Sequence, residues 1–346
     1  MLSRALRVKK DIFSGSRYFV PKRNVHVCVV GAAGDIGSNL ALLLKQNPRI
    51  SVLHLYDDDE KVFKIGTELN EIPGGPVVTG FTGSPFLPAA IRDANLILLV
   101  GRTPRRLGYS REHMLATNAP NVLKVSKIVA EQNPDAFFAI STNPINSIIP
   151  FVSSILHKYK AYDFSKVFGI THIDTARARA FTAKYLNINP RHLHVPVIGG
   201  HSDDTIVPLY SKIMPSHYNV DSYQADTLTR LLKTAGTKII SSKLGHDSAT
   251  LAMAWSINEC AENLIDALCG NYVIVNCYTL NPHFGTRYFS GPTKVGGYGI
   301  VEVFKNNFEM NEYEKDLLKK AVSVLNDDIV KGEDYVGILE NPRMNR

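Results

Sequence analysis

Two arginines, Arg105 and Arg111, lie six residues apart in a short segment that also contains Pro104 and Gly108. A guanidinium group stays charged at ordinary pH and binds a carboxylate through two parallel hydrogen bonds. Two such charges in one loop predict a ligand with two negative ends. A small dicarboxylate is therefore the leading candidate for the substrate.

A second group of residues combines an acid–base side chain with a further cation. Asp174 and Arg177 are three residues apart in a stretch of helical pattern, so they share one helix face, and His201 follows in the segment GGHS at 199–202. A histidine oriented by a carboxylate can accept a hydroxyl proton near neutral pH, as hydride transfer at a carbinol carbon requires. Arg177 can bind a substrate carboxylate. The structural alternatives are a turn residue at His201 and an ordinary helical ion pair between the other two.

A glycine-rich segment upstream predicts a dinucleotide site. It follows an apolar run directly and opens a helical pattern, and Asp57 lies 20 residues beyond its last glycine. In such a turn the backbone approaches a pyrophosphate, a helix N-terminus supplies N–H donors, and the acid binds a ribose hydroxyl. Because Asp58 and Asp59 add two carboxylates that repel a 2′-phosphate, NAD is favoured over NADP. The segment consists of Gly31, Ala32, Ala33, Gly34, Asp35, Ile36 and Gly37.

The elements that must position these residues can be read from the apolar pattern. Short strand-like runs at 25–30, 52–56, 95–100 and 136–140 alternate with helical patterns at 36–45, 113–131 and 146–157. This alternation predicts a parallel sheet covered by helices. We therefore expect a doubly wound parallel-sheet (Rossmann) domain over residues 24–168.

The pattern changes in the second half of the chain. Helical patterns at 173–186, 223–243, 248–269 and 311–330 surround strand-like pieces at 194–206, 272–278, 285–290 and 299–303. This predicts an α+β substrate domain over residues 169–340, with the active site in the crevice between the domains. No flexible linker separates the halves, so we expect a tight interface. In the helix at 223–243, three- and four-residue steps predict one buried face formed by Leu228, Leu231, Leu232, Ala235 and Ile239.

The charge is concentrated at the N-terminus. Of the formal net charge of +7 in 346 residues, +6 falls within residues 1–23, a segment with seven Arg and Lys against one Asp that is also rich in Ser and has intermittent apolar positions. It resembles a mitochondrial presequence, so we expect a mitochondrial matrix protein; the alternative is a basic disordered tail. The remainder is close to neutral, so we expect neither a nucleic-acid nor a membrane partner.

The four cysteines form no C-x-x-C pair and have apolar neighbours, so free buried thiols and no metal site are expected. They are Cys28, Cys260, Cys269 and Cys277.

From about residue 25 to 339 the sequence resembles the lactate/malate dehydrogenase family, and the mitochondrial-type malate dehydrogenases in particular. Seven collinear segments carry this resemblance, and their order and spacing make it specific. They are GAAGDIG at 31–37, LYD at 55–57, TPRRLGYSR at 103–111, STNPIN at 141–146, GITHIDTAR at 169–177, VPVIGGHS at 195–202 and SATLAM at 248–253.

The resemblance implies a role for each matching position. His201 would be the proton acceptor that Asp174 orients, and Arg105, Arg111 and Arg177 would bind the two carboxylates, with Arg105 on a loop that closes over the substrate. The implied reaction is the oxidation of L-malate by NAD to oxaloacetate in a homodimer. Positions implied to contact the cofactor are the 31–37 segment, Asp57, Asn118, Ser141, Thr142, Asn143 and Met253, and Asn143 also lies near the substrate.

Several positions depart from the family pattern and leave alternatives open. Where a family glycine has a positive φ, another residue costs about 1 to 2 kcal/mol, so a catalytically weakened paralogue acting as a binding or structural subunit is the second hypothesis. A narrower rival is a lactate dehydrogenase, which Arg105 argues against because a monocarboxylate would leave its charge unpaired. The departures are Asp35, Arg102, Leu107, Asp203, His246 and Asp247.

Overall fold

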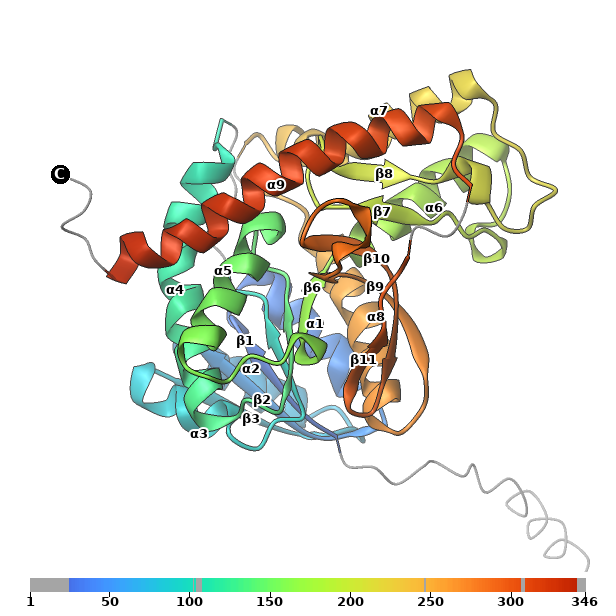
Figure 1. Ribbon diagram of the computed structural model, residues 1–346. Coiled ribbons are helices and arrows are strands. Elements are labelled where there is room, and N and C mark those ends of the chain that lie inside the picture. The colour runs from blue at the N-terminus through green and yellow to red at the C-terminus, as the bar shows by residue number, and fades with distance from the viewer. Residues whose placement is uncertain (1–24, 102, 104–107, 246, 306–308, 341–346) are drawn as a thin grey trace, which may run out of the picture.

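The computed structural model describes residues 25–101, 103, 108–245, 247–305 and 309–340 (Figure 1). The predicted presequence at 1–23 and the position of Arg105 lie outside these residues. So do Arg102, Leu107 and His246.

The first half forms the predicted doubly wound sheet. Six parallel strands lie side by side in the order β3-β2-β1-β4-β5-β6. The chain adds strands in one direction from β1 to β3 and in the opposite direction from β4 to β6, so the strand order reverses between β1 and β4. Such a reversal opens a crevice at the carboxyl ends of the strands. The elements are β1 (Val25–Val30), α1 (Asp35–Lys45), β2 (Ile50–Asp57), α2 (Lys61–Asn70), β3 (Val77–Thr82), α3 (Leu87–Ile91), β4 (Leu96–Leu99), α4 (Arg111–Gln132), β5 (Phe137–Ile140), α5 (Ile145–Lys158) and β6 (Val167–Ile170).

Helices cover both faces of this sheet because successive strand residues point to opposite sides. In β1, Val27 and Val29 belong to one core with residues of α1 and α8 (Leu251–Leu268). Cys28 and Val30 belong to a second core with residues of α4, α5 and α9 (Glu312–Glu340). A strand buried on both faces reads as a continuous apolar run, which is why VHVCVV predicted it.

The sheet does not end with the first half. Strand β6 pairs antiparallel with β9, and the order continues through β10, β7 and β8, with β11 on β10, so one sheet of 11 strands runs through both halves. The expected tight contact is therefore made by backbone hydrogen bonds as well as by packing. The remaining elements are α6 (His172–Leu186), β7 (Val197–Gly199), β8 (Ile206–Pro208), α7 (Ser222–Ser242), β9 (Val273–Leu280), β10 (Tyr288–Gly296) and β11 (Gly299–Glu302).

Helix α7 corrects one prediction. It begins after Asp221, which forms a capping box with Gln224, and its predicted apolar face is only partly buried. Leu228 and Leu232 are buried, but Leu231 is 37% exposed. The expected face was too wide, because Leu231 lies at its edge.

The long helix α9 crosses the molecule from the end of α4 and α5 to the region of α7 and β8 (Figure 1). It extends ten residues beyond the predicted end at residue 330. Its packing against α5, β7 and β8 joins the two halves on the side of the molecule that carries the predicted histidine loop. The C-terminal helix is therefore close enough to contribute to the site.

None of the four cysteines forms a disulfide bond in the described part of the chain, and three of them are buried as predicted, whereas Cys269 is half-buried. Burial raises the pKa of Cys28 and Cys260 well above the ordinary value. No cluster of metal-binding side chains occurs among the described residues, and none of their helices has the length and apolar character of a membrane span.

Candidate active site

The glycine-rich turn has the shape that a pyrophosphate requires. Gly31 has a φ of +94°, and a Cβ there would lie 2.3 Å from the Cα of Gly101; a Cβ on Gly37 would lie 2.2 Å from the carbonyl oxygen of Gly31. Gly34 caps α1 without a side chain, so the first N–H groups of that helix have no side-chain acceptor at the cap. The residues present therefore fit a dinucleotide, which the helix N-terminus and the close-packed turn would hold.

Asp57 stands at the end of β2, beside this turn. Its Oδ2 accepts a hydrogen bond from the Ala33 N–H at 2.9 Å, and its Oδ1 accepts one from the Asp59 N–H at 3.2 Å. The carboxylate is thereby fixed at the wall of a cleft of about 640 Å³ that also contains the 31–37 turn and Asn118. Each oxygen keeps a lone pair that can accept a ribose hydroxyl.

The three acids that depart from the family pattern have less backbone strain than expected. Asp35 is the first residue of α1 and is exposed, and no positive φ occurs at Asp35, Asp203 or Asp247. The predicted cost of about 1 to 2 kcal/mol for a left-handed residue is therefore wrong at these three positions. Asp247 lies in the cleft wall, where its Oδ1 accepts the Ser248 N–H at 2.7 Å.

The loops that follow β4 and β5 are tied together at the junction of two cavities. Asn118 of α4 accepts the Thr103 N–H at 2.8 Å and donates to the Asn143 carbonyl at 2.8 Å. The Thr142 hydroxyl donates to the Gly101 carbonyl at 2.8 Å. These bonds hold the end of the cofactor cleft against a second, smaller cavity, which is lined in part by Asn118, Ser141, Asn143 and Met253.

The smaller cavity, of about 140 Å³, brings together the predicted acid–base residues. His201, in the β7–β8 loop, lies with Nδ1 at 2.7 Å from Oδ2 of Asp174 at the start of α6. The Asp174 side chain is 2% exposed. Because an ionised carboxylate can only accept, Nδ1 carries the proton that it donates to Asp174, and Nε2 keeps its lone pair for a substrate proton.

Arg177 lines the same cavity, one turn after Asp174 on α6. Burial lowers the pKa of this guanidinium, while the charges of Asp174 and Asp203 act in the opposite direction. Within the described part of the chain, no ion pair involves Arg177, whereas His201 and Arg111 both have carboxylate partners within 4.0 Å. A half-buried guanidinium group without an ion-pair partner among the described residues attracts an anionic ligand strongly.

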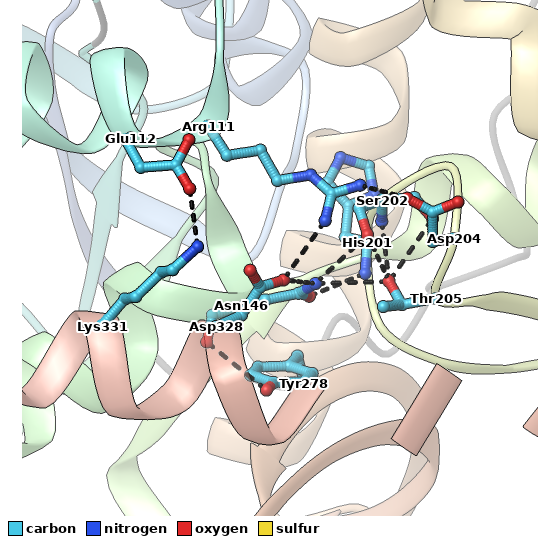
Figure 2. Close-up of polar contacts among 10 residues, drawn as sticks. All are labelled: Arg111, Glu112, Asn146, His201, Ser202, Asp204, Thr205, Tyr278, Asp328 and Lys331. Carbon is cyan, nitrogen blue, oxygen red and sulfur yellow. Dashed lines mark hydrogen bonds and ion pairs between the residues drawn. The ribbon is translucent and has the colours of Figure 1, made fainter. Parts of the chain in front are cut away.

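Arg111 is the first residue of α4, which begins after its N-cap Ser110. Its Nη2 lies 3.0 Å from Oδ2 of Asp204, and its Nη1 lies 3.5 Å from Oδ2 of Asp328 (Figure 2). The structure thus places three of the predicted arginine and histidine side chains, Arg111, Arg177 and His201, around one cavity. Arg105 is outside the described residues.

The polar residues at or beside the cavity include four that were not predicted as site residues. Lys233 of α7 lines the cavity, and burial lowers its pKa, while the charges of Asp204 and Asp203 raise it. Asn146 falls within a segment that carried the family resemblance, which was the one available signal. The other two, Asp204 and Asp328, are ordinary acids in the sequence and carried no signal. The four are Asn146, Asp204, Lys233 and Asp328.

A glycine-rich dinucleotide cleft that opens onto a carboxylate-backed histidine and two arginines defines the class: a nicotinamide-dependent dehydrogenase of a small acidic substrate. Comparison with known proteins gives the family. Residues 25–169 match the NAD-binding domain of lactate/malate dehydrogenase, and residues 171–336 match its α/β C-terminal domain. The chain belongs to the lactate/malate dehydrogenase family, and its cofactor is NAD.

Similar proteins cover almost the whole chain. It is 34% identical over 320 residues to the mitochondrial malate dehydrogenase of Macaca fascicularis, covering 92% of this chain and 94% of that protein. It is 35% identical over 310 residues to the peroxisomal malate dehydrogenase 1 of Arabidopsis thaliana, covering 89% of this chain and 87% of the relative.

Solved structures support the fold. The malate dehydrogenase of Picrophilus torridus in its apo form superimposes with a TM-score of 0.78 at 20% identity, covering 91% of this chain and 99% of that one. The lactate dehydrogenase of Cryptosporidium parvum, solved with lactic acid and nicotinamide adenine dinucleotide, gives 0.77 at 22% identity, covering 90% and 98%.

Proposed function

We propose that this protein catalyses the reversible, NAD-dependent oxidation of L-malate to oxaloacetate. The observation that carries the proposal is the single cavity in which a histidine backed by a buried carboxylate faces two guanidinium groups, next to the NAD cleft. The curated relatives, which are malate dehydrogenases, support the choice of substrate.

His201 is the proposed proton acceptor. Its Nε2 takes the proton of the substrate's C2 hydroxyl, and the imidazolium that forms is stabilised by Asp174 at 2.7 Å. Bound NAD would supply the hydride acceptor for the same carbon. In the reverse direction His201 returns the proton to the carbonyl oxygen of oxaloacetate.

The arginines are proposed to hold the two carboxylates. Arg177, which has no ion-pair partner among the residues that the structure describes, binds the 1-carboxylate. Arg111, together with Arg105 six residues earlier in the sequence, binds the carboxylate at the other end. The residues proposed to contact NAD are Gly31, Ala32, Ala33, Gly34, Asp35, Ile36, Gly37, Asp57, Asn118, Ser141, Thr142, Asn143 and Met253.

The test is spectrophotometric oxidation of NADH by the purified chain, with oxaloacetate and with pyruvate as substrates. We expect turnover of oxaloacetate in large preference to pyruvate, and His201→Asn should lower kcat by about 10²-fold or more while NADH still binds. Preference for pyruvate would favour a lactate dehydrogenase. NADH binding without turnover of either substrate would favour the weakened paralogue, a hypothesis that none of the observations above supports.

Location and assembly are further parts of the proposal. The basic leader at 1–23 and the mitochondrial relatives support a mitochondrial matrix protein, although a peroxisomal relative is similarly identical. Exposed apolar side chains on the packed helices α1 and α8, Leu42, Leu251 and Trp255, support a homodimer. We expect a leader-dependent mitochondrial signal for a fluorescent fusion, and a mass of two chains in sedimentation.

The proposed division into domains, 24–168 and 169–340, is supported by the two family matches, which cover residues 25–169 and 171–336.

A further inference from the structure

Asp328 is a buried carboxylate that the proposed mechanism does not use. It lies on α9, more than a hundred residues beyond His201 in the sequence, and its side chain is 7% exposed. Burial raises its pKa, and a hydrogen bond from Asn146 and the charge of Arg111 act in the opposite direction. A buried acid is costly unless it is paired, so its partners matter.

Its partners are two residues of the site (Figure 2). Oδ2 of Asp328 accepts a hydrogen bond from Asn146 Nδ2 at 3.0 Å and lies 3.5 Å from Arg111 Nη1. The same asparagine continues toward the histidine, because its Oδ1 accepts the backbone N–H of His201 at 2.8 Å. One carboxylate oxygen thus connects a proposed substrate-binding arginine with the loop of the proposed proton acceptor.

The packing of α9 on α5 makes this contact possible. Gly332 lies one helical turn after Asp328, and a Cβ at Gly332 would lie 2.1 Å from the carbonyl oxygen of Ser147. The absence of a side chain allows the two helices to approach closely. Asp328 is therefore held against Asn146, the residue that precedes Ser147, by a fixed helix–helix contact.

The other charges around Asp328 leave Arg111 as its main electrostatic partner. Glu112 of α4 and Lys331 of α9 form their own ion pair at 2.6 Å, so their effects on Asp328 largely cancel. Tyr278 of β9 is fully buried, and the charge of Asp328 contributes to its raised pKa. This tyrosine is neutral at ordinary pH, so it does not compensate the carboxylate.

We infer that Asp328 is a positioning residue of the dehydrogenase, which fixes the Arg111 guanidinium by charge and the His201 loop through Asn146. The inference rests on the proposed roles of Arg111 and His201. It assigns to the C-terminal helix two separable tasks. The charge of Asp328 holds Arg111, and its acceptor oxygen holds Asn146.

Two variants separate the tasks, with Asp327→Asn as the matched control because Asp327 is an exposed acid on the same turn of α9. Asp328→Asn removes the charge and keeps an acceptor for Asn146, so KM for oxaloacetate should rise about five- to tenfold with kcat within about twofold. Asp328→Ala removes both, so kcat should also fall about tenfold, because the His201 loop loses a support. NADH affinity should stay unchanged in all three, because Asp328 is not among the residues that line the cofactor cleft.

The outcomes are distinct. If the parent protein does not reduce oxaloacetate, the proposed function fails. If it does, and Asp328→Asn has the KM of Asp327→Asn, the inference is overturned, whatever the change in melting temperature. Should Asp328→Asn not fold, Asp328→Glu replaces it: the longer side chain keeps the charge but displaces it, so a raised KM for oxaloacetate supports the inference and an unchanged KM overturns it.

Discussion

Asp204 forms an ion pair with Arg111, whose guanidinium group is proposed to bind a substrate carboxylate. In the structure Oδ2 of Asp204 lies 3.0 Å from Nη2 of Arg111 (Figure 2). A substrate carboxylate therefore competes with Asp204 for the charge and the N–H donors of this guanidinium. Replacing Asp204 with Asn removes the competing charge and keeps the side-chain shape, and should therefore lower KM for oxaloacetate.

The size of the effect follows from exposure. The Asp204 side chain is 69% exposed, whereas Asp328, on the other side of Arg111, is 7% exposed. Two charges about 4 Å apart in water attract by about 1 kcal/mol, and exposed ion pairs contribute roughly 0 to 1 kcal/mol. Loss of this competition should lower KM by up to about fivefold, since 1.4 kcal/mol corresponds to a factor of about ten. We expect little change in kcat, because Asp204 does not contact His201 Nε2.

The assay is steady-state NADH oxidation with varied oxaloacetate at low ionic strength, where screening is weakest. Asp203→Asn is the matched control: it removes the same charge from the same loop, and no ion pair joins Asp203 to Arg111 among the described residues. Asp203 also lines the cavity and its charge acts on Arg177, so its effect measures the field of the loop on both arginines. A KM for Asp204→Asn equal to that of the parent protein would refute the competition, and a higher value would mean that Asp204 orients Arg111 productively.

Three further predictions address the cofactor turn, the loop arginine and pH. Gly37→Ala should destabilise the protein by about 1 to 3 kcal/mol in thermal melts, because its Cβ would overlap backbone, whereas Gly34→Ala meets only one atom at 3.7 Å and should not. Arg105→Gln should sharply lower malate turnover and relax the preference toward lactate, and unchanged kinetics would remove Arg105 from that role. Burial lowers the pKa of His26 to about 4, so the folded state resists its protonation. Below the ordinary value of 6.5, stability should fall with pH by up to about 1.4 kcal/mol per pH unit, and chemical denaturation of His26→Leu should show a smaller loss between pH 7 and pH 5.

The parts of the fold that the sequence predicted are those with a strong local pattern. Strand β1 and helix α4 were expected within two residues of their observed bounds, because a doubly buried strand and a long helix have distinctive patterns. Helix α2 was not expected, since it buries only Val62, Gly66 and Leu69 and therefore has a weak apolar stripe. Strand β3 was missed as well. It lies at the edge of the sheet, where part of each face is exposed.

The candidate site was likewise predicted from the sequence only in part. The His201–Asp174 pair was predicted from residue types and a family resemblance, and the structure places them 2.7 Å apart. The carboxylates on Arg111 were not predicted, because they come from distant segments, the β7–β8 loop and α9. Contacts between segments so far apart depend on the register of whole helices, which no local pattern encodes.

The two arginines that line the cavity, Arg111 and Arg177, differ in their ion-pair partners, and this difference affects substrate specificity. Arg177 has no carboxylate partner within the described ranges, whereas the positive charge of Arg111 is partly neutralised by Asp328 and Asp204. The first carboxylate of a ligand is therefore attracted most strongly to Arg177, and a monocarboxylate gains this contact without disturbing the Arg111 pairs. A dicarboxylate competes with the exposed Asp204 for Arg111. A further positive charge at the second end would therefore raise the preference for the dicarboxylate, and Arg105, six residues before Arg111 in the sequence, is the predicted source of that charge.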